Sequence, residues 1–384
     1  GDLAKALGGA VRAAFHDVGA FTKATNEGRP NGCFLLDDPG NNGLAPYVRN
    51  ISQYYAEMPA VDGFSKADLI QYAGLVALEH SHKIALSLFP GVPDIPELYA
   101  NFRVGRVDAP NCPTGWVTRE DNNLMVEPER FLLPAPVGGF AHIRDTMINR
   151  AGMPVADVVA LMGAHTLGSL TKDGAGFQGQ WVQQNNALDN DFYSTILDRS
   201  WSRVRFNNLP QWEDPQRSSI AMLNTDLTLA FQVRLNFEGC TSINTGATND
   251  CLDNDATGAQ ADQIESRRLM EEFAGGPTRN HTLGLSRWYT AFVPAFLRMG
   301  EMGYTAAELV EPCDLPARCD EPEPTARPTP EPITKSPTSR PSESPSRSPT
   351  LRPTARPSNS PSTSPSPEPS NAPVQLGDDD DDDD

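Results

Sequence analysis

His165 is the residue whose surroundings first suggest chemistry. It ends a segment, residues 155–165, in which apolar side chains recur at helical spacing, and the small residues Gly163 and Ala164 before it leave room for a large flat group. A buried histidine that hydrogen-bonds a backbone carbonyl is the simpler alternative. Asp226 favours a metal instead, because an aspartate that accepts the Nδ1 proton of a ligating histidine orients the ring toward the metal. The sequence therefore predicts a metal bound to His165.

Arg12 and His16 form a second candidate group. They are four residues apart in an amphipathic segment, residues 3–21, so both side chains project from one face, with Phe15 beside them. An exposed pair next to an apolar stripe is the alternative. Burying an arginine and a histidine together is costly unless each has a function, so the pair is a candidate for catalysis.

The elements that must position these residues are predicted to be helical. Loops are expected over residues 22–48 and 102–111, and no stretch shows the period-two alternation of several strands. The fold class is therefore predicted to be all-α. Helical periodicity predicts helices over residues 3–21, 67–85, 139–151, 155–165, 189–197, 220–233 and 287–299.

The composition changes near residue 320. Of the 384 residues, 35 are proline, and over residues 337–373 a proline falls at every fourth position among serine, threonine and arginine. Such a segment buries too little surface to order itself, so residues 313–384 are predicted to form a disordered, extended stalk beyond a body of residues 1–312. The closing aspartates, residues 378–384, are interpreted as a solvated solubility tail, the alternative being a block that binds cations or a surface.

Charge and hydropathy exclude two classes of partner. The formal net charge of −19 disfavours nucleic acid, because phosphate binding needs clustered lysine and arginine. No apolar run approaches the roughly 18 residues of a membrane span, so none is expected.

The cysteines and sequons predict a cellular location. Six cysteines without a CxxC spacing favour disulfides over a metal site, and sequons begin at Asn50 and Asn280. Together with the stalk, these features predict a secreted glycoprotein associated with a cell wall. The candidate disulfide pairs are Cys240 with Cys251, Cys313 with Cys319 and Cys33 with Cys112.

Five motifs resemble those of the haem peroxidases of the plant, fungal and bacterial superfamily. They lie within residues 11–303, in the family's order and at similar spacings. The proximal motifs and the loop FRVGRVD look like the cytochrome c and ascorbate peroxidase branch, whereas Phe15 replaces that branch's tryptophan and is similar to the secreted fungal and plant enzymes. The chain therefore resembles a hybrid peroxidase. The motifs are RAAFHD with Arg12 and His16, DPGNNGL with Asn41, ALMGAHTLG with His165, GFQGQW with Trp181 and MLNTD with Asp226.

The resemblance implies a two-lobed helical fold with a b-type haem between a distal half of about residues 1–112 and a proximal half of about residues 113–312. His165 would be the axial ligand of the haem iron, made more anionic by Asp226. Trp181 matches the tryptophan that stores an oxidising equivalent as a radical in the cytochrome c peroxidase branch.

The resemblance also implies roles on the open face of the haem. His16 would take a proton from hydrogen peroxide and return it to the leaving oxygen, while Arg12 stabilises the developing charge. Asn41 would orient His16 and keep it basic, and Phe15 would line the same face.

Donor sites of particular relatives are not matched. Lys5 and Gly9 stand where manganese-oxidising relatives carry glutamates, Ala160 where lignin-type relatives expose a tryptophan, and Gly174 where the ascorbate branch uses an arginine. We therefore expect small phenolic or aromatic donors. The alternative is a redox protein such as cytochrome c, or ascorbate, which Trp181 suggests.

Cation sites of relatives are matched only in part. Asp17, Thr166 and Asp189 match ligand positions, whereas Val182 and Gln184 do not. Too few oxygen ligands remain for a hard cation, so calcium and potassium are expected to be absent.

The sequence thus predicts a secreted peroxidase that reduces hydrogen peroxide to water through one-electron oxidations of a small donor. An inactive cell-wall or surface protein on a peroxidase scaffold, its tail touching the wall, is the alternative from another class. Residues 235–286 match no motif and are expected to form an inserted surface loop.

Overall fold

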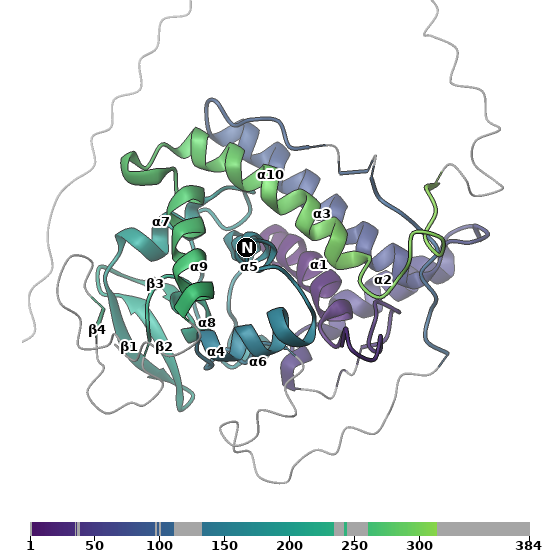
Figure 1. Cartoon of the computed structure of the whole chain (residues 1–384), viewed down its shortest axis with the longest axis horizontal. Coiled ribbons are helices and arrows are strands. Elements are labelled where there is room, and N and C mark those ends of the chain that lie inside the picture. Colours follow the sequence, from purple (N-terminus) through teal and green to yellow (C-terminus); the bar gives the residue numbers. More distant parts are fainter. Residues whose placement is uncertain are drawn as a thin grey trace, which may run out of the picture. The chain divides into compact units, whose positions relative to one another are not determined.

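A computed structural model of the chain describes residues 2–34, 36, 39–96, 98–99, 101–110, 133–233, 242–243 and 260–312 (Figure 1). The described residues belong to one unit of the chain, residues 1–325. The predicted stalk and five of the six cysteines lie outside the described residues, so the stalk and the cysteine pairings stay predictions. Cys33 is described and is disulfide-bonded.

Three helices build the N-terminal part. They are α1 (Asp2–Val18), α2 (Ala45–Glu57) and α3 (Lys66–Leu88), and α1 packs against α3 and, further along the chain, α10 (His281–Gly300). α3 starts at a capping box, in which Ser65 and Asp68 satisfy each other's backbone N–H groups. Predicted residues 3–21 and 67–85 are thus helical with ends shifted by a few residues, whereas α2 begins at the end of the predicted loop over residues 22–48 and was otherwise not predicted.

The remaining helices surround α5 (Val155–Met162), which continues into a 3₁₀ turn (Gly163–Thr166) that carries His165. α5 is apolar on most sides and packs against α9 and α10. Helices predicted over residues 139–151, 155–165, 189–197 and 287–299 are confirmed with shifted ends. The helices of this part not yet given a range are α4 (Phe140–Ile143) with a following π-helix (Arg144–Arg150), α6 (Lys172–Ala175), α7 (Asp191–Asp198), α8 (Asn224–Leu227) and α9 (Gln260–Phe273).

The all-α prediction holds only roughly, because a small antiparallel sheet accompanies the helices. Its strands are β1 (Trp201–Phe206), β2 (Leu209–Asp214), β3 (Arg217–Met222) and β4 (Ser242–Ile243), in the order β3-β2-β1-β4. Asn207 and Asn208 both have positive φ between β1 and β2, which is the backbone of a two-residue hairpin turn. The helix predicted over residues 220–233 is therefore wrong at its start, where β3 lies, and only the short α8 follows.

The sheet supports α8, the helix that carries Asp226. Trp201 and Trp212 are fully buried, and Trp212 Nε1 donates to Asn224 Oδ1 at 2.7 Å. Because Asn224 begins α8, the buried Trp212 of the inner strand β2 holds this short helix in place.

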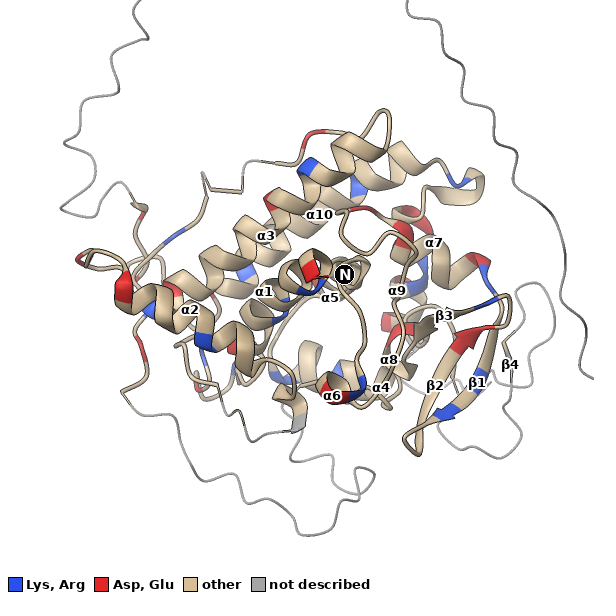
Figure 2. Cartoon of the chain, turned by 180° about the vertical axis from the view of Figure 1, so that it is seen from behind, with Lys and Arg blue, Asp and Glu red and all other residues tan. Residues whose placement is uncertain are grey.

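The surface loop predicted over residues 235–286 is wrong for its second part, which contains α9 and the start of α10. Leu269, Met270 and Phe273 of α9 are buried in the core. The other face of α9 is charged, and Arg268 pairs with Glu265 and Glu272 along it (Figure 2). This charged face masks the apolar one in the sequence, because six of the first nine residues of QADQIESRRLMEEF are charged or carry a side-chain amide.

The loop FRVGRVD is anchored by a buried ion pair. Arg106 Nη1 lies 2.7 Å from Asp68 Oδ1, with both side chains almost fully buried, and Arg106 Nε donates to the carbonyl of Gly300 at 2.7 Å. The loop therefore ties the start of α3 to the end of α10. In the part of the chain that the structure describes, no helix combines the length and apolarity needed to cross a bilayer.

Candidate functional site

His165 and Asp226 meet in the proximal half, as the sequence predicts. His165 Nδ1 lies 2.7 Å from Asp226 Oδ1, and the carboxylate is completely buried. Its second oxygen accepts from Trp181 Nε1 at 2.9 Å and from the backbone N–H of Leu223 at 2.7 Å. Since Asp226 engages Nδ1, Nε2 is the ring nitrogen of His165 that is left to bind a metal.

The His165 ring also stacks on Trp181. The ring centroids lie 4.3 Å apart with an interplanar angle of 14°. Trp181 is buried, whereas 32% of the His165 side chain is exposed. Asp226 therefore fixes both rings, and one edge of His165 opens away from the core.

This donor set fits haem iron. Among the described residues, no group of three or more His, Cys, Asp or Glu side chains could hold a metal ion. A metal held by His165 alone would bring most of its own ligands, as haem iron does. A single imidazole whose Nδ1–H donates to a carboxylate is the protein ligand that such an iron needs.

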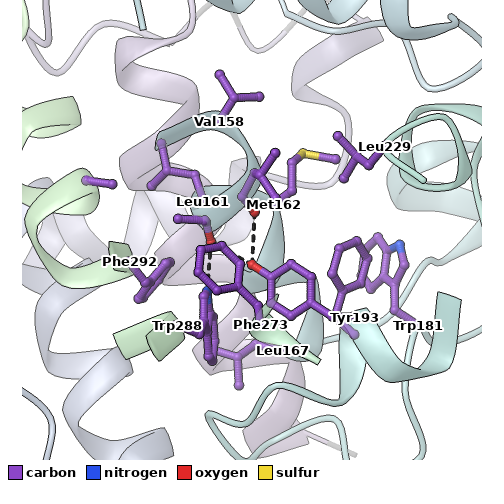
Figure 3. Packing of buried hydrophobic residues seen from close by; sticks show 14 of the residues in the cluster. Val158, Leu161, Met162, Leu167, Trp181, Tyr193, Leu229, Phe273, Trp288 and Phe292 are labelled. Carbon is purple, nitrogen blue, oxygen red and sulfur yellow. Dashed lines mark hydrogen bonds between the residues drawn. The ribbon is translucent and has the colours of Figure 1, made fainter. Parts of the chain in front are cut away.

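The space beside Gly163 is not open to a flat ligand, so that part of the sequence interpretation is wrong. A Cβ at Gly163 would lie 2.3 Å from Tyr193 Oη and 2.6 Å from Trp288 Nε1. Both polar groups donate to the carbonyl of Ala160, as the packing in Figure 3 illustrates. Gly163 therefore lets two aromatic rings form a rigid wall behind the 3₁₀ turn.

Arg12, His16 and Asn41 come together at the other half. His16 Nδ1 lies 2.8 Å from Asn41 Oδ1, and Arg12 Nε donates to His16 Nε2 at 3.1 Å. Because Asn41 Oδ1 can only accept, Nδ1 carries the proton, and the electron pair of His16 lies on Nε2, where it accepts from Arg12 Nε. Phe15 meets the His16 ring edge-on, with centroids 5.9 Å apart.

Burial and charge keep His16 neutral. Burial, followed by the positive charge of Arg12, lowers the pKa of His16 to about 3, against a smaller raising effect of the Asn41 hydrogen bond. Burial lowers the pKa of Arg12 to about 10, so its guanidinium stays charged at neutral pH. The site therefore offers a neutral base next to a fixed cation.

The two halves of the site are neighbours. α1 packs against the 3₁₀ turn of His165, and His165 lies close enough to His16 to contribute to the lowering of the His16 pKa. The site residues of both halves thus belong to one site between α1 and the end of α5.

Two carbonyl groups were missed by sequence reasoning. Arg12 Nη1 donates to the carbonyl of Asn42 at 2.8 Å, and Arg12 Nη2 donates to that of Gly40 at 2.9 Å. Backbone carbonyls leave no trace in residue types, so only the neighbouring Asn41 could have pointed to this turn.

The candidate cation ligands have protein partners. Asp17 Oδ1 accepts from the backbone N–H groups of Gly32 at 2.8 Å and Asn31 at 3.3 Å. Thr166 Oγ1 donates to Asp189 Oδ1 at 2.5 Å. Burial raises the pKa of Asp17 to about 7 and that of Asp189 well above its usual range.

Comparison with known proteins identifies relatives of the chain. A family model described as "Peroxidase" matches residues 2–237. The chain is 30% identical over 225 residues to the mitochondrial cytochrome c peroxidase of Yarrowia lipolytica, covering 57% of each chain. It is 33% identical over 191 residues to peroxisomal L-ascorbate peroxidase 5 of Arabidopsis thaliana, covering 49% of this chain and 56% of that one. Cytosolic L-ascorbate peroxidase 1 of Oryza sativa is 31% identical over 191 residues, covering 49% of this chain and 64% of that one. The chain thus spans between about half and two thirds of the length of these relatives.

The predicted location is wrong. The relatives are named as mitochondrial, peroxisomal and cytosolic proteins, which overturns the prediction of a secreted, wall-associated protein. One of the sequon asparagines has a different use in the structure, because Asn280 Oδ1 accepts from the backbone N–H of Leu283 and caps α10. The helix cap accounts for an asparagine at this position without a glycan.

Proposed function

The chain belongs to the peroxidase family, and we propose that it reduces hydrogen peroxide with electrons taken from a reducing donor. The observation that carries this proposal is the pair of histidines on neighbouring elements: His165 has its Nδ1 engaged by buried Asp226, and His16 has its electron pair on Nε2, where it accepts from Arg12. One histidine is suited to bind a metal, and the other to move a proton.

The cofactor of this proposal is a b-type haem, whose iron His165 Nε2 would bind. When bound, haem supplies the electron-transfer chemistry that peroxide reduction needs. Asp226 holds the His165 ring and increases the electron density on Nε2, because its carboxylate accepts the Nδ1 proton at 2.7 Å.

His16 and Arg12 divide the work on peroxide between them. His16 Nε2 accepts the proton of the attacking peroxide and returns it to the leaving oxygen, a contribution of about 10²- to 10⁴-fold. Arg12 stabilises negative charge on the leaving oxygen, since its guanidinium is held charged and aimed by the carbonyls of Gly40 and Asn42. Asn41 keeps the proton on Nδ1, which leaves Nε2 basic.

Trp181 is proposed to hold a positive charge when an electron leaves the site. Its Nε1–H donates to Asp226 Oδ2 at 2.9 Å, so a negative charge lies next to the indole in a buried environment. An oxidised indole is stabilised by such a neighbour.

Small phenolic or aromatic compounds are the first proposal for the donor. The second proposal is a redox protein such as cytochrome c, or ascorbate. The contact of Trp181 with Asp226 and the names of the relatives support it, which makes it comparable to the first. An inactive scaffold is the remaining alternative. It is opposed by the hydrogen bonds that orient Arg12, His16 and His165, which a decayed site need not keep.

The test is the rate of reaction of the haem-loaded protein with hydrogen peroxide, followed by stopped-flow absorbance. His16→Leu should slow it by about 10²-fold or more, whereas the exposed-histidine control His80→Leu should leave it unchanged. Turnover with a phenol, ascorbate and reduced cytochrome c then ranks the donors. A wild-type protein that binds haem and does not react with peroxide would refute the proposal.

A further inference from the structure

We infer that Gly43 and Gly174 are positioning residues, whose backbone contact fixes the position of the turn that holds Arg12 and His16. The inference rests on the proposed function, and it adds to it a link from the proximal half of the site to the proton-transfer group.

One turn holds both distal side chains. In the 3₁₀ turn Pro39–Asn41, the Asn41 side chain accepts from His16 at 2.8 Å. The carbonyls on either side, of Gly40 and Asn42, accept from Arg12 at 2.9 Å and 2.8 Å. A displacement of this turn therefore changes the proton position on His16 and the direction of the Arg12 guanidinium together.

The turn rests on α6. Gly43 follows it with a left-handed φ of 80°, and a Cβ at Gly43 would lie 2.6 Å from Gly174 Cα. Such a distance means that the two backbones are in direct contact and that no other residue fits there without a shift. Gly174 is the third residue of α6, and its N–H donates to the side chain of Thr171, which caps the helix.

α6, which the turn contacts, is itself held by the chain segment that carries His165 and Trp181. Leu170 and Gly179 exchange backbone hydrogen bonds of 2.7 Å and 3.3 Å, which closes the loop that contains α6 between His165 and Trp181. The position of Gly174 is therefore set by the same chain segment that carries both proximal rings. Through Gly43, this segment sets where the distal turn can lie.

Catalysis is sensitive to such a contact, because a misplacement of about 1 Å can cost about 10²-fold in rate. Gly43→Ala adds both a strained backbone and a clash. At Gly174, whose φ is not in the left-handed region, a Cβ would lie 2.5 Å from Thr171 Oγ1 and 3.9 Å from Gly43 Cα, so Gly174→Leu disturbs the cap of α6 and the neighbouring contact with Gly43. Neither glycine has a side chain that could touch substrate, so in wild type each can act only through its backbone.

The experiment measures the rate of the peroxide reaction in haem-loaded variants from pH 4 to 8. Gly43→Ala and Gly174→Leu should each be slower by about 10- to 100-fold with full haem content. The control is Gly276→Ala, which carries a similar φ of 70° with nothing within 4 Å of the added Cβ, and it should match wild type. Equal rates in both test variants and the control would overturn the inference.

A double-mutant cycle separates positioning from general damage. In an Asn41→Val background the turn has lost its hold on His16 and keeps only the carbonyl bonds to Arg12, so Gly174→Leu should slow the reaction less than it does in the wild-type background. The full effect in that background would overturn the inference, because Gly174 would then act elsewhere. If both glycine variants lose haem, Thr171→Ala is tested instead, because it removes the cap of α6 without adding bulk. A wild-type rate and pH profile in Thr171→Ala would refute the inference that α6 positions the turn.

A second readout does not need turnover. The NMR resonance of Arg12 Nε–H reports its bond to His16 and should shift in Gly43→Ala and Gly174→Leu but not in Gly276→Ala. If wild type fails to react with peroxide, the proposed function fails, while the resonance still tests the positioning role. If wild type reacts with peroxide but the resonance is unshifted in Gly43→Ala and Gly174→Leu, only the positioning role of the two glycines is refuted.

Discussion

Replacing Asp226 by asparagine should weaken haem binding by forcing a choice between three hydrogen-bond donors. The two carboxylate oxygens accept from His165, Trp181 and the backbone of Leu223, at 2.7, 2.9 and 2.7 Å. An amide has one accepting oxygen. If the NH₂ group faced Trp181 and Leu223, two N–H donors would lose their acceptor. If it faced His165, only one would, so this second orientation should be favoured.

The consequence for His165 follows from that orientation. An NH₂ group opposite Nδ1 favours the tautomer with the proton on Nε2, which removes the electron pair that would bind iron. If the proton stays on Nδ1, a charge-assisted hydrogen bond of about 1.5–3 kcal/mol is lost instead. Either result matches the 10- to 100-fold loss of metal affinity typical of such partners, about 1.4 to 2.7 kcal/mol of binding free energy.

The assay is haem titration of the apoprotein, with the dissociation constant taken from the absorbance change. Asp214→Asn is the matched control, since Asp214 is also buried and ionically paired, with Arg199, but has no contact with the site. An unchanged dissociation constant and spectrum in Asp226→Asn would refute the argument that Asp226 sets the His165 tautomer.

Three further predictions concern pH and stability. His16 has a pKa lowered to about 3, so the peroxide reaction should be independent of pH from about 8 to 4 and fall below that, which a stopped-flow pH profile would check. Burial raises the pKa of Asp17 from 3.8 to about 7, so the folded protein binds this proton more tightly than the unfolded chain does. The free energy of unfolding should therefore decrease as pH rises from about 4 to 7. Urea titrations should show this dependence in wild type and its loss in Asp17→Asn. Arg106→Met should lower the free energy of unfolding by about 3–5 kcal/mol because it leaves Asp68 buried without its counter-ion, whereas Arg29→Met, at a partly exposed pair, should cost less than about 1 kcal/mol.

Sequence reasoning succeeded where one apolar face repeats along a helix. The periodicity around Arg12 and His16 places both on α1, and the apolar run before His165 becomes α5 and its 3₁₀ turn. The contact of His165 with Asp226 was predictable because metal-ligating histidines need such a partner. These features depend on residue types and on local spacing, which the sequence contains.

The rest depends on partners far apart in the chain. The hairpin strands each have only a few inward residues, so their alternation is too short to detect, although Asn207–Asn208 is a turn signal that could have been weighed. The open space expected at Gly163 was wrong because Trp288, more than a hundred residues later, fills it. The carbonyls that hold Arg12 belong to a turn whose position depends on Gly174, and no local pattern encodes that contact.

The tie between Arg106 and Gly300 has a consequence for how the chain is made. The two residues are 194 positions apart, so at a synthesis rate of about 5–20 residues per second the loop waits about 10 to 40 seconds for its partner. During that time α1 and α3 lack the apolar cover of α10, and Arg106 and Asp68 pair without the burial that α10 completes. The N-terminal helices are therefore expected to expose apolar surface until α10 is made, so the yield of folded protein should increase when chaperones are present during synthesis.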